Sequence, residues 1–365
     1  MKRALKILGI FLLVVALIVA GYVCYVFAAY DRIEDKQTLA VVSGQTQTAQ
    51  TDSPYRLVCW NIGFGAYEDD YSFFMDGGTE SWAWSEERLM ENLDEIGQTV
   101  LALEPDITLL QEVDFDSTRT YHVNEADLLR HFSLGGMGLN DRTDSVFAVN
   151  YHSPFLFYPF DQPHGTSRSG LLTISSLTID SALRRSLPVE TGVTKFLDLD
   201  RCYSVSRIPV ENGKTLCLYN LHLSAYTSDG TIADEQLALL LADMQAEFAA
   251  GNYVVGGGDF NKDLLGNSGD WFGISTDGYT WAQPIKAELF ADKSLRLVAP
   301  LDESNPIPSC RNADAPYHDG QLLLTVDGFI VSDNVRTERS AVYDTAFANS
   351  DHQPILLEFT LLDAE

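Results

Sequence analysis

The segment Val254-Val255-Gly256-Gly257-Gly258-Asp259-Phe260-Asn261 constrains the fold of this chain more than any other. Two β-branched residues are typical of a strand, and the three glycines that follow let the backbone turn and approach another part of the chain. Asp259 and Asn261 stand at positions i and i+2, so both side chains can leave the strand end on one face. A carboxylate and a carboxamide held together in this way suit a site that activates water or orients a phosphate.

Four other short apolar runs also carry polar residues suited to chemistry near one end. These are Asn61 at the end of 57–61, Glu112 at the end of 106–112, Asn220 and His222 at the end of 216–222, and Asp327 near the start of 325–331. Ser350-Asp351-His352 precedes a last apolar run at 355–360. Polar residues often cap single strands, but layered α/β folds assemble their sites from strand-end residues of separate segments. We therefore expect these side chains to lie together.

In this order the segments resemble the endonuclease/exonuclease/phosphatase superfamily, the DNase I-like metal-dependent phosphoesterases. The resemblance covers roughly residues 52–362, and 169–175 is similar to the central strand of the family. It rests on Trp60-Asn61, Gln111-Glu112, Asn220-Leu221-His222, Gly258-Asp259-Phe260-Asn261, Asp327 and Ser350-Asp351-His352. It implies an α/β fold, a four-layer sandwich of two mostly antiparallel β-sheets flanked by helices, with the site at one edge.

Two helices and several strands follow from the hydrophobic pattern. Ser85 is a candidate N-cap for a helix that ends before Pro105, and a second helix is expected over about 231–250. The loops at 62–84 and 262–320 are expected to shape a pocket. Strands are expected at 55–61, 106–111, 145–150, 170–175, 202–210, 215–222, 253–259, 325–331 and 354–361.

The N-terminal apolar run Ile7–Ala29 has 23 residues and no charge. As a helix it would span roughly 34 Å, enough to cross a bilayer. The basic residues in 1–6 favour a cytoplasmic N-terminus, so 7–29 is predicted to be a single-pass anchor in the cell membrane. Residues 30–53 are then a flexible tether, and 54–365 form an extracytoplasmic catalytic domain. A cleaved signal peptide, with a cleavage site at Val26-Phe27-Ala28, is the alternative.

The net charge of −28 disfavours nonspecific electrostatic binding to nucleic acid or anionic lipid. No stable nucleic-acid partner is therefore expected. No protein partner is predicted, and the expected partner is a phosphate-ester substrate of unidentified class. The five cysteines do not make a disulfide scaffold in a domain of this size. An Asn212-Gly213 hairpin turn would place Cys202 opposite Leu223 and Cys217 opposite Ile208, too far apart for a bridge.

A hard divalent cation relieves the repulsion between a phosphoryl group and its nucleophile, and carboxylate and amide oxygens are its natural ligands. Glu112 is the first candidate ligand, with Asn61 beside it, and Asp351 completes the shell or binds a second ion. Mg²⁺ is the expected cofactor, with Mn²⁺ or Ca²⁺ as alternatives.

Asp259 is predicted to align the attacking water as general base, and Asn261 to hold a non-bridging oxygen. The resemblance implies that Asp327 orients His352 against the phosphoryl group. His222 stands where the DNase-like and sphingomyelinase-like branches carry a histidine, and it could protonate the leaving oxygen; which histidine is acid and which is base stays open. Arg168 and Arg311 are candidates for gripping a substrate phosphate.

The predicted function is a membrane-anchored, extracytoplasmic, Mg²⁺-dependent phosphoesterase that hydrolyses a phosphodiester or phosphomonoester. A sphingomyelinase-like phospholipid phosphodiesterase, a DNase-like nuclease and a hydrolase of small soluble esters are the alternatives within the family. A catalytically silent binding module is the alternative outside enzymes, and the filled polar positions argue against it.

Overall fold

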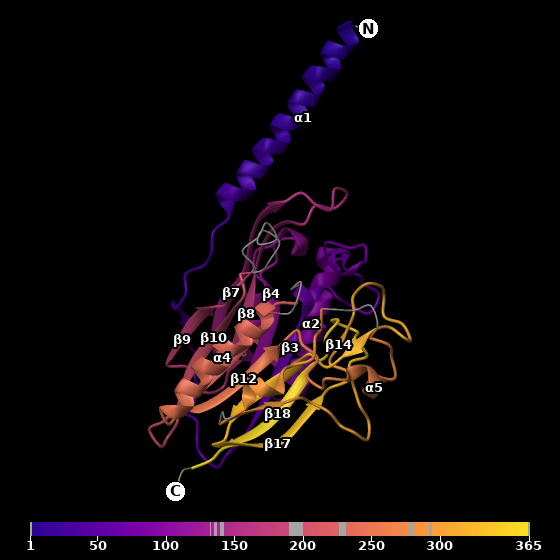
Figure 1. Cartoon of the computed structure of the whole chain (residues 1–365). Coiled ribbons are helices and arrows are strands. Elements are labelled where there is room, and N and C mark those ends of the chain that lie inside the picture. The colour runs from indigo at the N-terminus through magenta and orange to yellow at the C-terminus, as the bar shows by residue number, and fades with distance from the viewer. Residues whose placement is uncertain are drawn as a thin grey trace.

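Two seven-stranded β-sheets form the body of the protein (Figure 1). The computed structural model describes residues 2–131, 133–134, 137–138, 142–189, 200–225, 231–276, 281–291 and 294–363. The first sheet has the order β1 (Gln37–Leu39), β9 (Ser181–Ser186), β10 (Cys202–Pro209), β11 (Thr215–His222), β12 (Tyr253–Asp259), β16 (Asp327–Ser332), β13 (Leu295–Val298). The second has the order β17 (Val335–Val342), β18 (Ile355–Leu361), β3 (Pro54–Asn61), β4 (Ile107–Asp114), β8 (Gly165–Ser175), β7 (Asp144–Leu156), β2 (Val41–Val42).

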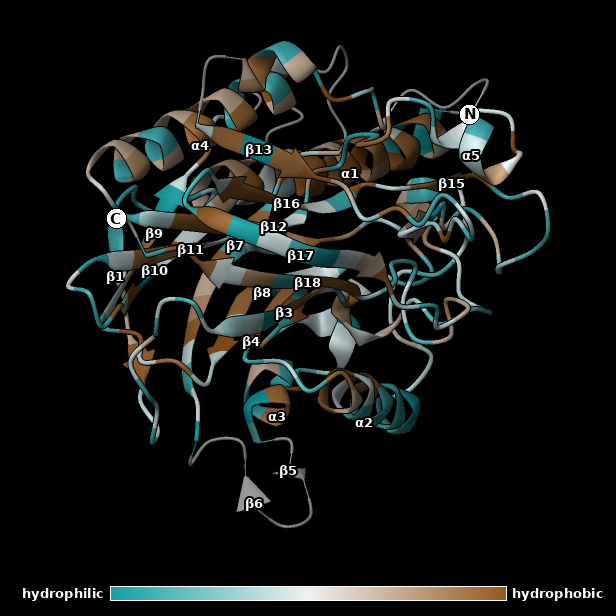
Figure 2. Ribbon diagram, turned by 90° about the horizontal axis from the view of Figure 1, so that it is seen from below, coloured by the Kyte–Doolittle hydropathy of each residue, from teal (hydrophilic) through white to brown (hydrophobic). Residues whose placement is uncertain are grey.

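The sheets stack against each other, and helices cover their outer faces (Figure 2). Leu109 and Leu218 belong to the core between the sheets, whereas their chain neighbours Leu110 and Cys217 belong to clusters beneath helices. Because strand side chains alternate between faces and both faces are buried, the strands are apolar almost throughout. The main covering helices are α2 (Glu86–Ala102) and α3 (Glu125–His131) on the second sheet and α4 (Thr231–Ala249) on the first.

This arrangement confirms the predicted four-layer α/β sandwich. Most strand pairs are antiparallel, and the parallel pairs among the named strands are β3 with β4 and β11 with β12. The first predicted helix is also confirmed, because the Ser85 side chain accepts a hydrogen bond from the Arg88 amide at 3.1 Å and caps α2.

Several strands escaped the sequence pattern. β9, β13 and β17 lie at or next to sheet edges; β9 carries two arginines, and β17 carries two arginines and a glutamate. Smaller elements outside the sheets are β5 (Ser133–Leu134), β6 (Met137–Gly138), β14 (Cys310–Arg311), β15 (Leu323–Leu324) and the short helix α5 (Ser268–Phe272).

The hairpin between β10 and β11 differs by one residue from the predicted register. Cys217 pairs with Arg207, not Ile208, because Val210 bonds to Lys214 and the turn holds three residues. Gly213 has φ +81° there, as the left-handed position of such a turn requires. The thiols of Cys59, Cys202, Cys217 and Cys310 are buried and free, as expected.

The N-terminal helix α1 (Lys2–Ala29) projects from one end of the sandwich (Figure 1). Its 28 residues are long and apolar enough to cross a membrane, and Val26 is the one described residue of the helix that is buried. The segment after it differs from the flexible tether expected at 30–53. Within it β1 pairs with β9 and β2 with β7, and Ala49 is fully buried in the core. The few apolar residues of this polar segment pack on the core, and its two short strands extend both sheets.

Candidate active site

Four parallel-running strand ends bring the polar residues to one edge of the sandwich. β3 and β4 end side by side, with Asn61 in register with Gln111. In the other sheet His222 is in register with Asp259, and Asp259 with Asp327. The predicted side chains therefore lie together at one edge, because the carboxyl ends of parallel strands share an edge.

A bulge in β4 places Glu112. In a regular strand, residues three apart face opposite sides. Leu110 and Val113 nevertheless both face the helix side of the second sheet, and the β4–β8 register shifts between them, so β4 contains one extra residue here. Glu112 has φ +54°, which is uncommon for a residue with a side chain. The inserted residue turns its carboxylate toward the pocket, and such local strain is typical of functional positions.

The glycines of β12 allow the close approach that the sequence suggested. A Cβ on Gly258 would lie 1.9 Å from the carbonyl oxygen of Leu221 on β11. Asn261 then takes a left-handed conformation with φ +49°, donates its amide proton to Asp259 Oδ1 at 2.8 Å, and donates from Nδ2 to the Leu223 carbonyl. The turn after the strand is therefore fixed by its own polar residues.

Asp259 is the centre of the site. Its Oδ2 accepts a hydrogen bond from Asn61 Nδ2 at 3.1 Å, and it lies 3.3 Å from His222 Nε2 and 3.7 Å from His352 Nε2. Burial raises the pKa of Asp259 to about 7, with a further contribution from Asp327, against the opposing charge of His352. A carboxylate with this pKa can accept a proton near neutral pH.

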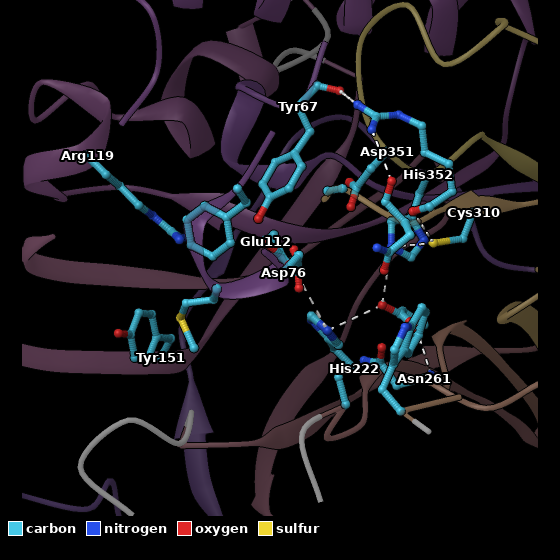
Figure 3. Close-up of a pocket in the computed structure, with 18 of the residues that line it drawn as sticks. Tyr67, Asp76, Glu112, Arg119, Tyr151, His222, Asn261, Cys310, Asp351 and His352 are labelled. Carbon is cyan, nitrogen blue, oxygen red and sulfur yellow. Dashed lines mark hydrogen bonds and ion pairs between the residues drawn. The ribbon is translucent and has the colours of Figure 1, made fainter. Parts of the chain in front are cut away.

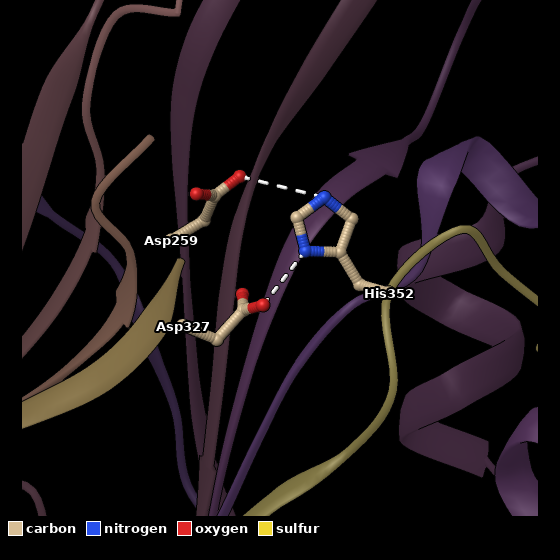
Figure 4. A group of neighbouring side chains, drawn as sticks. All are labelled: Asp259, Asp327 and His352. Atoms are coloured by element: carbon tan, nitrogen blue, oxygen red, sulfur yellow. Dashed lines mark hydrogen bonds and ion pairs between the residues drawn. The ribbon is translucent and has the colours of Figure 1, made fainter. Parts of the chain in front are cut away.

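Asp327 and His352 form a buried pair (Figure 4). His352 Nδ1 lies 2.8 Å from Asp327 Oδ2, which also accepts a hydrogen bond from Ser309 Oγ at 2.7 Å. Burial lowers the pKa of His352, but the charge of Asp327 and other acidic neighbours outweighs it and raises the pKa well above its usual range. The pairing that the resemblance implied is thus present, and it favours the imidazolium form.

His222 has the opposite electrostatics. Burial, with added repulsion from Arg201 and His352, lowers the pKa of His222 well below its usual range. This imidazole is therefore neutral at physiological pH. The two histidines flank Asp259 in different protonation states, and that difference separates their chemical roles.

These residues line one pocket of about 320 Å³ (Figure 3). Glu112, Asp259, Asn261, Asp351, His222 and His352 are all in its wall. The η2 loop at Phe74–Asp76 and the loop at 310–313 supply much of the rest, consistent with the pocket-forming loops expected at 62–84 and 262–320.

The structure does not bring Arg168 to this pocket. Arg168 is in register with His152 across the β7–β8 pair, on the exposed face, with its guanidinium 5.4 Å from the centre of the Phe115 ring. Arg311 does line the pocket, but its guanidinium donates to backbone carbonyls of 67–71 and 312–315. It holds two pocket loops together.

Two other arginines line the wall, and the sequence pattern missed them. Arg119 forms two hydrogen bonds with Asp114 at 2.9 Å and lies 3.7 Å from the centre of the Phe64 ring. Arg201 lies just before β10. Tyr151 and His164 also face the pocket, and burial lowers the pKa of His164 to about 3. The alternation along β7 could have indicated Tyr151, because its neighbour His152 faces outward.

Carboxylates in the pocket fit a divalent cation. Burial, together with the negative charge of Glu112, raises the pKa of Asp351 to about 6, so a cation near both would relieve an unfavourable charge arrangement. Asp259, Asp327 and His352 also place one potential ligand atom each within 4.8 Å of one another. In that group, however, the Asp327–His352 hydrogen bond already occupies two of the atoms. Asn61 presents Nδ2 to Glu112 at 3.2 Å, while its Oδ1 accepts from Gly63.

The sequence profile of the endonuclease/exonuclease/phosphatase family matches residues 58–352. Solved structures of similar fold include an endonuclease/exonuclease/phosphatase from Beutenbergia cavernae DSM 12333, with a TM-score of 0.56 and 17% identity, covering 85% of this chain and 72% of that one. The human Nocturnin catalytic domain with bound sulfate anion has a TM-score of 0.52 and 19% identity, covering 88% and 97%. A family protein from Leptotrichia buccalis C-1013-b has a TM-score of 0.53 and 15% identity, covering 84% and 99%. At these identities the likeness shows the fold. A comparison with curated proteins found no significant match.

Proposed function

This chain belongs to the endonuclease/exonuclease/phosphatase family, and we propose that it hydrolyses a phosphate ester by metal-assisted attack of water. One observation carries the proposal. A buried carboxylate with a pKa near neutrality, Asp259, lies between a neutral and a cationic histidine in a pocket that also holds the carboxylates of Asp76, Glu112 and Asp351. Such paired opposite shifts are typical of acid–base sites.

Glu112 and Asp351 are the residues proposed to hold the cation, with Mg²⁺ as the proposed ion and Mn²⁺ or Ca²⁺ as alternatives. Bound there, it would polarise a phosphoryl oxygen and neutralise charge. Asn61 donates hydrogen bonds from its amide nitrogen to Glu112 and Asp259, and in this orientation it positions both carboxylates. Ligation of the cation through Oδ1 would require the side-chain amide to rotate and would break the hydrogen bond from the Gly63 amide to Oδ1.

The proton transfers are assigned from the electrostatics. Asp259 accepts a proton from the attacking water, and Asn61 holds its carboxylate in place. His352, kept cationic by Asp327, donates from Nε2 to the phosphoryl or leaving oxygen. His222 is neutral, which suits orientation of Asp259 better than donation of a proton, so the proposed acid is His352. Asn261 remains the proposed partner of a non-bridging oxygen.

The first experiment is a substrate panel measured with Mg²⁺ and with EDTA. It holds plasmid DNA, RNA, sphingomyelin vesicles, bis-p-nitrophenyl phosphate, inositol phosphates and nucleotides. Metal-dependent turnover is expected, and Asp259→Asn should lower kcat by about three orders of magnitude with an unchanged circular dichroism spectrum. Asp333→Asn, an exposed carboxylate at the far end of β16, is the matched control. Near-normal activity in Asp259→Asn would overturn the assignment of the base.

We further propose that α1 anchors the protein in the cell membrane with the catalytic domain outside the cytoplasm. The support is the apolar length of α1 and the basic residues that precede it. A C-terminal fusion to alkaline phosphatase, which is active only after export, should be active and fractionate with membranes. Activity in the soluble extracytoplasmic fraction would instead favour a cleaved signal peptide.

A further inference from the structure

The tip of the β7–β8 hairpin exposes a cluster of aromatic side chains. Phe157, Tyr158 and Phe160 are 54%, 63% and 83% exposed, and in the part of the chain that the structure describes no large apolar side chain outside α1 is as exposed. Phe155 packs on Phe157 with ring centres 5.1 Å apart. We call Phe155, Phe157, Tyr158 and Phe160 the aromatic tip. A soluble surface rarely exposes such a group unless it contacts a partner or a membrane.

The aromatic tip contacts the helix that is long enough to cross a membrane. Tyr22 Oη of α1 donates to the Phe155 carbonyl at 3.3 Å and accepts from the Phe157 amide at 3.1 Å, and the Phe155 amide donates to Tyr25 Oη at 3.1 Å. The Tyr22 and Phe157 rings meet edge to face, 5.5 Å apart. The tyrosine hydroxyls satisfy backbone groups at the hairpin tip, so α1 and the tip are joined by directional bonds.

Tyr22 and Tyr25, which contact the aromatic tip, stand at the point along α1 where a membrane-spanning helix would reach the membrane surface. At 1.5 Å per residue, Tyr22 and Tyr25 lie about 24 and 28 Å along the helix from Lys6, close to the thickness of a hydrocarbon core. Tyrosine is enriched at that depth because its ring is apolar and its hydroxyl is polar. With Lys6 at one surface, the aromatic tip lies at the level of the other.

The pocket opens at the same end of the molecule. β7 runs in the same direction as β4, because both pair antiparallel with β8, so its end lies at the edge that carries Glu112. Phe74 joins the two features, with its ring 5.9 Å from Tyr158 of the tip and 6.1 Å from pocket-lining His164. Figure 1 shows the hairpin reaching toward the base of α1.

We propose that the aromatic tip rests in the headgroup layer of the membrane that α1 crosses and holds the pocket mouth at that surface, so that the substrate is the phosphate ester of a membrane lipid. The substrate part rests on the proposed hydrolase function; the membrane contact does not. A pocket of about 320 Å³ accommodates one headgroup. The net charge of −28 disfavours anionic lipid, so the matching surface is zwitterionic.

The membrane contact is tested with full-length protein in phosphatidylcholine vesicles. In a Cys24→Ser background the four remaining cysteines are buried, so Phe160→Cys can be labelled with an environment-sensitive fluorophore. Its emission should shift to the blue and be quenched at least threefold by a nitroxide lipid. The same fluorophore attached to Asp333→Cys, at the opposite end of the sandwich, should keep the emission of a water-exposed label. Equal, water-like behaviour at both positions would overturn the contact, and burial without lipid quenching would indicate a protein partner instead.

The substrate class is tested with Phe157→Ser combined with Phe160→Ser. Turnover of phosphatidylcholine or sphingomyelin in vesicles should fall at least tenfold, whereas turnover of bis-p-nitrophenyl phosphate should stay within twofold. Val42→Ser, an exposed apolar residue at the far end of the sandwich, should change neither. Hydrolysis of the soluble ester without any lipid hydrolysis would overturn the substrate class. Hydrolysis of neither would refute the catalytic proposal and leave the fluorescence result standing.

Discussion

The charge of His352 depends on one carboxylate. Asp327 Oδ2 lies 2.8 Å from Nδ1 and is the largest influence that raises the pKa of this histidine against burial. Asp327→Asn should therefore lower that pKa, so that the high-pH limb of the kcat profile moves to lower pH and kcat falls about 10²- to 10⁴-fold. The pH–rate profile measures both effects, with Asp333→Asn as control. An unshifted limb would show that His352 is not the acid.

Glu68 is a buried carboxyl outside the catalytic group, and burial raises its pKa from 4.5 to about 7. Between these values the folded state holds a proton that the unfolded state releases, so the free energy of unfolding falls as pH rises from about 4.5 to 7. Glu68→Gln removes this titration. The variant should gain stability relative to the parent across that window, by up to about 3 kcal/mol, in urea unfolding at pH 5 and pH 8. A pH-independent difference would contradict the prediction.

Sequence reasoning found the site residues that end strands and missed those that reach the pocket by long-range packing. Asp259, His222 and Asp327 could be predicted because register and strand direction place them together. Arg119 could not, because it lies outside the strands and is held by Asp114 and the Phe64 ring, contacts that no strand pattern predicts. Arg168 was a polar residue at the right end of a strand, but alternation turns it outward.

At the element scale, β11 and β12 can pair at the site only because Gly258 has no side chain. Gly258→Ala would bring a Cβ to 1.9 Å from the Leu221 carbonyl oxygen, so the parallel pair must separate where it positions Asp259 and His222. We expect a loss of more than about 3 kcal/mol of stability, or failure to fold. Gly266→Ala, at φ +73° in open space, should cost only about 1 kcal/mol. Chemical denaturation compares them, and equal losses would contradict the steric argument.

The same scale shows why some elements escaped prediction. The buried strands are apolar on both faces and were found, whereas the edge strand β17 exposes polar side chains and β9, next to an edge, carries two arginines and two serines, so neither showed an apolar run. The hairpin register was wrong by one because a three-residue turn replaced the expected two-residue one. Bulges such as that at Glu112 leave no periodic signal, since they interrupt the period itself.

At the scale of the whole molecule, α1 and the segment after it differ in their importance for the fold. α1 buries Val26 alone among its described residues, whereas the following segment contributes β1, β2, buried Ala49 and an Arg32–Asp200 ion pair at 2.9 Å. A chain that begins at Tyr30 should therefore keep the parent melting temperature within about 2 °C, because little packing is lost.

A chain that begins at Ser53 should melt roughly 5–10 °C lower, since it loses strand pairing and core packing worth several kcal/mol. Differential scanning fluorimetry distinguishes the two, and turnover of bis-p-nitrophenyl phosphate reports the site in each. Equal melting temperatures would restore the interpretation of 30–53 as a tether. The predicted difference would show that the anchor is attached to the sandwich through its own edge strands, which is the rigid connection that a pocket held at a membrane surface requires.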